Sequence, residues 1–232
     1  MNAAAGVPPR APVALAEARR LLASGTAVVL PHPAPLTHVV AATTASAVNR
    51  AKDRPPQQPV AAWAHHRDTL DALTPLWDLA PAHRTTALRL LSEENLTVLL
   101  PLRARTTPAP WLAATVKDGW MLLFGARWTP LLPLLDDHPV LYVSSANLTG
   151  RPSAADTGEA LAMFPPGTPV LHLPDGGGPH AEPASGVRGA TTTVRLVPDR
   201  GMHLHQHGAQ DRFHGRADGC LRHLRALHGD AD

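Results

Sequence analysis

Short apolar runs alternate with segments of helical spacing along most of this chain, and that alternation limits the folds open to it. Runs typical of buried strands lie at residues 27–30, 59–64, 96–100, 121–124, 140–143, 170–173 and 191–197. Helical patterns lie at residues 15–22, 45–52, 68–76, 81–91, 130–135 and 155–164. Strands that alternate with short helices predict an α/β fold.

Length and composition predict one domain with short appendages. The chain has 232 residues and is 44% hydrophobic, which is enough for a single sizeable core. Residues 1–12 are rich in Ala and Pro and are expected to be disordered. We expect the domain over residues 13–209, followed by a His- and Arg-rich tail at 210–232 with one weak helix near 217–227.

Charge and cysteine content exclude few classes of function. The formal net charge of +2 does not require a nucleic-acid partner. The single cysteine, Cys220, excludes an internal disulfide and a Cys-based zinc cluster. No apolar run approaches the roughly 20 residues of a membrane span, and the N-terminus lacks a signal-peptide pattern. We therefore expect a cytoplasmic protein without membrane contact.

The most informative stretch follows the apolar run at 140–143. Residues 145–153 read Ser-Ala-Asn-Leu-Thr-Gly-Arg-Pro-Ser. Open α/β sheets bind ligands at the carboxyl ends of their strands, where such a turn presents N–H groups and short polar side chains. Ser145 and Asn147 are therefore candidates to bind a phosphate or ribose, although an Asx turn that only closes the strand would look the same.

Four further residues are candidates for nucleotide binding. Lys52 and Arg54 are two cations at a predicted helix end, where they can clamp phosphates or simply face the helix dipole. Arg127 follows the run at 121–124 and is either a nucleotide ligand or an ordinary solvated arginine. Thr192 lies in a predicted strand, from which its hydroxyl can reach the nucleotide.

Several segments together resemble the YrdC family, the threonylcarbamoyl-adenylate synthases. Residues 145–153 resemble the family signature Ser-Ala-Asn-(Leu)-Ser-Gly-x-Pro-Ser. The other matching segments follow in the family's order over about residues 13–209: 52–55 (Lys-Asp-Arg-Pro), 96–101 (Leu-Thr-Val-Leu-Leu-Pro), Arg127 before Pro130, 175–179 (Asp-Gly-Gly-Gly-Pro) and 191–194 (Thr-Thr-Thr-Val).

The resemblance implies a fold and a reaction. The fold would be a YrdC-like single domain with a twisted mixed β-sheet flanked by helices. The reaction would be of the L-threonylcarbamoyladenylate synthase type, in which ATP, bicarbonate and a small amino acid give a carbamoyl-AMP and pyrophosphate for tRNA modification. Lys52 and Arg54 would then be catalytic by neutralising, together with magnesium, the phosphate charge of ATP. Ser145, Asn147, Arg127 and Thr192 would bind the nucleotide.

The departures from the family lie on the amino-acid side, which marks a diverged member. The family's Pro-Thr-Asp-Thr-x-Tyr-Gly becomes residues 31–37, in which Ala34 and Leu36 replace a Thr and a Tyr of the amino-acid pocket. Gln206 stands where the family has an Arg. We expect an altered pocket in which His32 and Thr37 bind the substrate.

Two alternatives stay open. One is a diverged paralogue in carbamoyl transfer of specialised metabolism; the other is a non-catalytic module that binds nucleotide, tRNA or double-stranded RNA. We assign no metal site to the protein itself: His203, His205 and His207 would share a strand face, but no acidic or Cys ligand stands near them.

Overall fold

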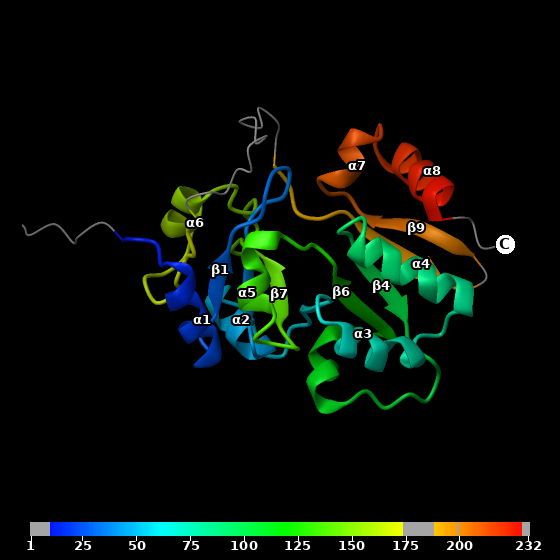
Figure 1. Ribbon diagram of the computed structural model, residues 1–232, viewed down its shortest axis with the longest axis horizontal. Helices are drawn as coiled ribbons and strands as arrows, with labels where there is room; N and C mark the ends of the chain where they lie inside the picture. Colours follow the sequence, from blue (N-terminus) through cyan, green and yellow to red (C-terminus); the bar gives the residue numbers. More distant parts are fainter. Residues whose placement is uncertain (1–9, 174–187, 199, 229–232) are drawn as a thin grey trace, which may run out of the picture.

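The computed structural model describes residues 10–173, 188–198 and 200–228, and its elements alternate along the chain (Figure 1). The strands are β1 (Val28–Leu30), β2 (Val39–Ala42), β3 (Ala61–Trp63), β4 (Thr97–Pro101), β5 (Val116–Lys117), β6 (Trp120–Phe124), β7 (Tyr142–Ser145), β8 (Thr193–Val197) and β9 (Gly201–Gln206). The α-helices are α1 (Leu15–Ala23), α2 (Ala45–Ala51), α3 (Arg67–Leu73), α4 (Pro81–Ser92), α5 (Leu132–Leu135), α6 (Thr157–Met163), α7 (Gln210–Phe213) and α8 (Ala217–His228). Short 3₁₀ helices are η1 (Thr74–Leu76), η2 (Pro110–Thr115) and η3 (Thr129–Leu131).

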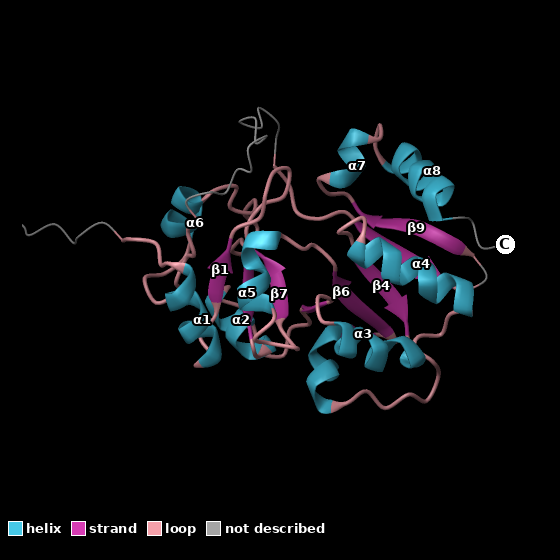
Figure 2. Ribbon diagram, in the orientation of Figure 1, coloured by secondary structure: helices cyan, strands magenta, loops and turns pink. Residues whose placement is uncertain are grey.

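Within the described residues, the strands form one mixed sheet, which confirms the predicted α/β fold (Figure 2). The strand order is β1-β2-β7-β3-β6-β4-β8-β9, with β5 paired to β6. The pairs β3/β6 and β4/β8 are parallel, and the remaining neighbours are antiparallel.

Both faces of the β1–β2–β7 half of the sheet are covered, which is why β1 and β2 are apolar throughout and β7 is apolar up to Val143. Alternation along β1 sends Val28 and Leu30 to one face and Val29 to the other. The first face packs against α1 and α5. The second face packs against α2 and α6.

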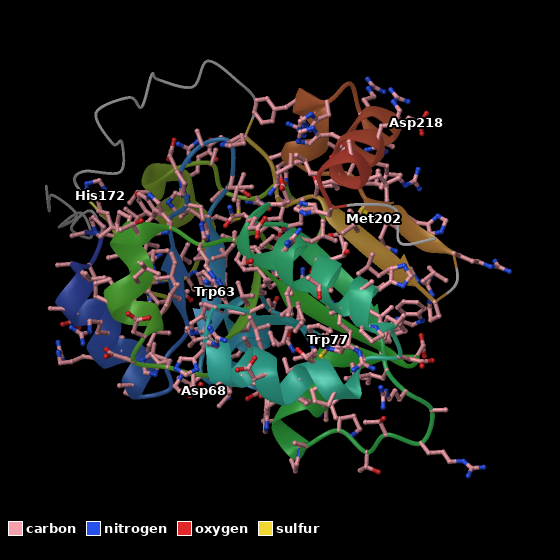
Figure 3. The ribbon with its side chains drawn as sticks, turned by 45° about the vertical axis from the view of Figure 1, so that its right-hand side comes forward. Trp63, Asp68, Trp77, His172, Met202 and Asp218 are labelled. Carbon is pink, nitrogen blue, oxygen red and sulfur yellow. The ribbon has the colours of Figure 1, made fainter. Side chains whose placement is uncertain are left out.

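The other half of the sheet is covered on one face by α3, α4 and α8. Leu90 of α4, Leu100 of β4 and Leu224 of α8 belong to one buried cluster, together with Trp77 and Met202, which Figure 3 labels. The opposite face of these strands is half-exposed. There Arg195 of β8 lies 3.5 Å above the Trp120 ring, so a cation–π contact covers part of it.

The sequence did not predict β2, β5 and β9, and β7 lies further along the chain than predicted. β2 follows a Pro-rich stretch, β5 has two residues, and β9 is an edge strand whose exposed histidines hide its alternation. Residues 170–173 form only isolated bridges, from Val170 to Val29 and from Leu171 to Val13. β7 runs to Ser145, so the polar signature begins inside the strand rather than after it.

The segment after Ala209 is packed on the domain. Asp211 of α7, and Cys220 and Leu224 of α8, are 1%, 1% and 2% exposed. This packing favours one unit that continues through α8.

Two predictions concern residues that the structure does not describe. Most of the predicted disordered N-terminus, residues 1–9, and the Asp-Gly-Gly segment at 175–179 lie outside the described residues. Among the helices of the described segments, none has the length and apolar character needed to cross a membrane.

Candidate functional site

A cavity of about 410 Å³ lies on one face of the sheet, beneath the loop that joins β1 to β2. It extends from the end of β7 to the first residues of β4 and β8, so it is not confined to the strand end predicted from the sequence. Its main polar lining residues are His32, Thr37, His38, Arg54, Thr97, Ser144, Ser145, Asn147, Thr191, Thr193 and Gln206.

Lys52, Arg54, Ser145 and Asn147 meet at one end of this cavity, although more than ninety positions separate the two cations from the signature. The Lys52 ammonium donates to the Ser145 carbonyl and, over 2.8 Å, to Asn147 Oδ1. Asn147 Oδ1 also accepts from Ser145 Oγ at 2.6 Å. Arg54 Nη1 approaches Ser144 Oγ at 3.4 Å. Lys52 is 0% exposed and stands behind the wall that Arg54, Ser145 and Asn147 form.

The electrostatics of this end favour an anion. Burial, and then the charge of Arg54, lower the pKa of Lys52 to about 7. Burial also lowers the pKa of the Arg54 guanidinium. Among the described lining residues there is no carboxylate to neutralise the two cations. An anion bound here would relieve both desolvated charges.

The loop between β1 and β2 forms the roof of the cavity. The His32 ring lies 5.6 Å from the centroids of both Trp63, labelled in Figure 3, and Phe124. Arg188 Nη1 supports the loop, donating to the carbonyls of His32 and Leu36 at 3.2 and 3.3 Å and to that of Ala155 at 2.9 Å. The two predicted substrate-binding residues, His32 and Thr37, therefore both face the cavity.

The two substituted positions of this loop differ in their surroundings. Leu36 is 8% exposed and lines the cavity. Ala34 is exposed and is not among the described lining residues. Only Leu36 therefore changes the cavity surface directly.

Thr192 does not belong to the cavity, contrary to its predicted role. Its Oγ1 donates to Asp211 Oδ1 at 2.9 Å, and it is fully buried on the far side of the backbone. Alternation sends its neighbours Thr191 and Thr193 into the cavity instead. The predicted residue therefore points away from the cavity, and the residues on either side of it line the cavity.

Arg127 also lies outside the cavity lining. Its backbone N–H donates to Asn95 Oδ1 at 2.8 Å, and its Nη2 donates to the Ala64 carbonyl at 3.3 Å. Burial lowers the pKa of its guanidinium. The structure gives Arg127 a role in fixing the chain after β6 and does not bring it to the four clustered residues.

Several lining residues were missed by reasoning from the sequence. His38 lies at the start of the unpredicted β2. Thr97 begins β4 and Thr191 lies just before the neighbouring β8, and their hydroxyls meet at 2.5 Å. Gln206 lines the cavity, so its replacement of a family Arg removes a charge from this site. Only Gln206 had a sequence indication, namely that substitution.

Close backbone approach fixes the strand that carries these threonines. A Cβ at Gly208 would lie 2.3 Å from the Thr192 nitrogen and 2.6 Å from the Ala190 oxygen. Only glycine fits there, so the chain after β9 can pack directly on residues 190–192.

The side chains of the described cavity lining do not form a typical protein metal site. The described residues contain no group of three or more His, Cys, Asp or Glu side chains placed to hold a metal ion. His203 Nε2 contacts the Arg200 carbonyl at 3.0 Å, whereas His207 Nδ1 contacts Asp211 Oδ2 at 2.7 Å, so the histidine triplet diverges. A magnesium ion in the cavity would be held by phosphate oxygens and water, as this ion prefers, with hydroxyl and amide oxygens nearby.

Comparison with known proteins identifies the fold. No family model matches the sequence, and no curated protein matches it. The structure of P. abyssi Sua5 complexed with L-threonine matches with a TM-score of 0.60 at 18% identity, covering 83% of this chain and 53% of that one. Full-length HypF in a phosphate- and nucleotide-bound form gives 0.60 at 16% identity, covering 83% and 28%. E. coli YciO gives 0.53 at 14% identity, covering 83% and 87%.

These matches confirm the fold expected from the resemblance. The chain has the fold that Sua5, HypF and YciO share, and it spans about half the length of the Sua5 structures that it matches.

Proposed function

We propose that this chain, which folds as the YrdC/Sua5 domain does, binds ATP in the cavity and uses it to form a carbamoyl-adenylate. The observation that carries the proposal is the meeting of Lys52, Arg54, Ser145 and Asn147 at one end of the cavity. Two desolvated cations and a turn of short polar groups suit the phosphates of a nucleotide. Bicarbonate and an amine substrate would supply the carbamate that reacts.

The proposed reaction needs no covalent enzyme intermediate. The amine and bicarbonate first condense with loss of water to a carbamate. A carbamate oxygen then attacks the α-phosphorus of ATP, and the bond from this phosphorus to the bridging oxygen breaks, so that pyrophosphate leaves with the electron pair. Arg54 would contact the phosphates directly. Lys52, behind the Ser145–Asn147 wall, would stabilise the phosphates by its charge and hold these groups in place. Magnesium would neutralise part of the phosphate charge.

The neighbours support both halves of the proposal. The HypF structure is described as phosphate- and nucleotide-bound, and the Sua5 structure as complexed with L-threonine. In this chain the amino-acid side is altered, because Leu36 and Gln206 line the cavity where the family resemblance places a Tyr and an Arg. The second candidate is therefore a related carbamoyl transfer with another substrate in specialised metabolism.

A non-catalytic role makes a different prediction. A module that only binds nucleotide, with or without tRNA or other double-stranded RNA, would bind ATP and release no pyrophosphate. Pyrophosphate release from ATP and bicarbonate, measured across a panel of amino acids and amines, separates the two roles. Release that depends on the amine supports the enzyme, and binding without release under every condition supports the module.

The phosphate assignment has its own test. We expect Lys52→Ala and Arg54→Ala to weaken ATP far more than AMP in calorimetry, because the two charges serve the outer phosphates. Arg50→Ala is the matched control, since Arg50 is an exposed cation of the same helix. Equal losses for ATP and AMP would remove the clamp assignment.

A further inference from the structure

His32, Thr37 and His38, in the cavity wall, have hydrogen-bonding atoms without a partner in the part of the chain that the structure describes. His32, Thr37 and His38 are 2%, 5% and 3% exposed. Within the described ranges, no partner is found for either ring nitrogen of the two histidines or for the Thr37 hydroxyl. Buried polar atoms nearly always have a partner, since an unpaired one destabilises the fold. All three residues line the cavity, so a bound ligand is the partner that this wall fits.

The two imidazoles offer hydrogen bonds without charge. Burial, and then His38, lower the pKa of His32 to about 3. Burial, and then Arg188, lower the pKa of His38 to about 4, against the opposing effect of Asp156. Each neutral ring presents one donor and one acceptor, and the Thr37 hydroxyl can do either.

A carboxylate bound beside His32, Thr37 and His38 would meet no free positive charge among the described lining residues. Burying a charged group is costly unless an opposite charge meets it. Arg54 is the one Lys or Arg among the described lining residues, and the proposed function assigns it to phosphate. Arg188 is not a lining residue, and its Nη1 is held by three backbone carbonyls. Gln206 adds a neutral amide where the family resemblance places a cation.

We propose that His32, Thr37 and His38 bind an uncharged donor–acceptor group of the second substrate, such as a carboxamide. The second substrate is then an amine that carries this group where an amino acid carries its carboxylate. The inference rests on the proposed function, because it takes Arg54 to be occupied by phosphate. It names the class of substrate for the same cavity.

A matched pair of ligands tests the proposal directly. L-threoninamide and L-threonine differ only in the group that the wall would bind. We expect calorimetry on the full chain, with ATP present, to show that threoninamide binds at least about tenfold more tightly than threonine. The difference reflects the cost of burying the threonine carboxylate without an opposite charge. Tighter or equal binding of threonine, or no binding of either ligand, overturns the inference.

Variants separate ligand binding from a structural role. His32→Phe keeps an aromatic ring against Trp63 and Phe124 and removes two nitrogens for which the described residues offer no partner. It should therefore keep or raise the melting temperature while weakening threoninamide about tenfold. Thr37→Val should act in the same direction. His205→Phe, at an exposed position of β9 outside the described lining, is the matched control. A lower melting temperature with unchanged affinity would make His32 a structural residue.

The pH dependence of binding distinguishes a carboxamide ligand from a carboxylate ligand. A separate measurement of ATP binding distinguishes this inference from the proposed function. With neutral imidazoles, threoninamide affinity should be flat from about pH 6 to about pH 8 once its own amine titration is subtracted. Affinity for threonine that rises as the pH falls would instead show a protonated histidine meeting a carboxylate, and would overturn the inference. The proposed function does not assign this wall to ATP. A protein that fails to bind ATP would contradict the proposed function. A protein that binds ATP but prefers threonine to threoninamide would contradict only the inference.

Discussion

Thr192 and Asp211 exchange two hydrogen bonds across the junction between β8 and the C-terminal helices. The Thr192 hydroxyl donates to Asp211 Oδ1 at 2.9 Å, and the Asp211 N–H donates to the same hydroxyl oxygen at 3.0 Å. Asp211 Oδ1 also accepts from the Gly208 N–H at 2.6 Å. The pair therefore fixes the segment whose neighbours, Thr191 and Thr193, line the cavity, and it links the C-terminal helices to the site.

Asp211→Asn should destabilise the protein by about 1–3 kcal/mol, because it leaves buried donors poorly paired. Thr192→Val removes the partner, so the double variant should cost less than the sum of the single changes. Urea denaturation of the four proteins in this cycle measures the coupling. Strict additivity would show that the two residues act independently.

The same carboxylate predicts a loss of stability in acid. Burial by itself would raise the pKa of Asp211, but hydrogen bonds from Gly208, His207 and Thr192 outweigh it and lower the pKa below 3.8. Because its pKa is lower in the folded state, the ionised Asp211 stabilises the protein at pH values above its unfolded-state pKa. This stabilisation is lost as the pH falls through the folded-state pKa. We therefore expect the difference in unfolding free energy between the wild type and Asp211→Asn to shrink below about pH 4. A difference that stays constant down to about pH 2 would contradict this account.

Removing the C-terminal helices should destabilise the domain. A chain that ends at Ala209 loses Asp211, Cys220 and Leu224, of which the last two belong to the buried cluster beneath α8. We expect a clearly lower melting temperature, since burying a single leucine contributes about 1.5–3 kcal/mol. A truncated chain that melts like the full chain would restore the boundary predicted from the sequence.

Cys220 gives a second measure of the same packing. Burial, and then Asp211 and Glu94, raise the pKa of its thiol to about 11. A thiol reagent should therefore modify it only when α8 opens. Leu224→Ala should speed this labelling, and rapid labelling of the wild type would show that α8 is not docked.

Lys52 predicts a second rise of stability with pH, in a higher pH window than that of Asp211. The folded-state pKa of about 7 lies below the ordinary 10.5, so the unfolded chain binds one more proton between these values. Stability should therefore rise with pH across this window, and Lys52→Met should abolish the rise. Bound phosphate would restore the charge, so ATP binding near pH 8 should take up a proton, which calorimetry in buffers of different ionisation enthalpy measures. Binding without proton uptake would place Lys52 out of reach of the phosphates.

Threonine should be a poor substrate because of Leu36 rather than Ala34. The buried Leu36 side chain offers no hydrogen bond to a ligand, whereas Ala34 is exposed outside the described cavity lining. Leu36→Tyr should improve the apparent affinity for threonine about tenfold, as one added hydrogen bond allows. Ala34→Thr, the matched change, should leave threonine-dependent pyrophosphate release unchanged. Efficient release by the unaltered chain at low threonine concentration would contradict this prediction.

The sequence by itself determined the fold class and four residues that gather at one end of the cavity. Periodicity predicted most helices and strands, because burial on both faces of the β1–β2–β7 half leaves continuous apolar runs. The resemblance of segments 52–55 and 145–153 to the family pattern singled out Lys52, Arg54, Ser145 and Asn147, and these residues meet in space.

Tertiary structure alone decided the remainder of the site. Which side of β8 faces the cavity depends on strand register, and one residue of shift exchanges Thr192 for Thr191 and Thr193. Whether α8 is a tail or part of the core depends on an apolar cluster built by α3, α4 and the sheet, far away in the sequence. The neutrality of His32 and His38 comes from burial by distant segments, because desolvation is a property of the folded surroundings and of no local pattern.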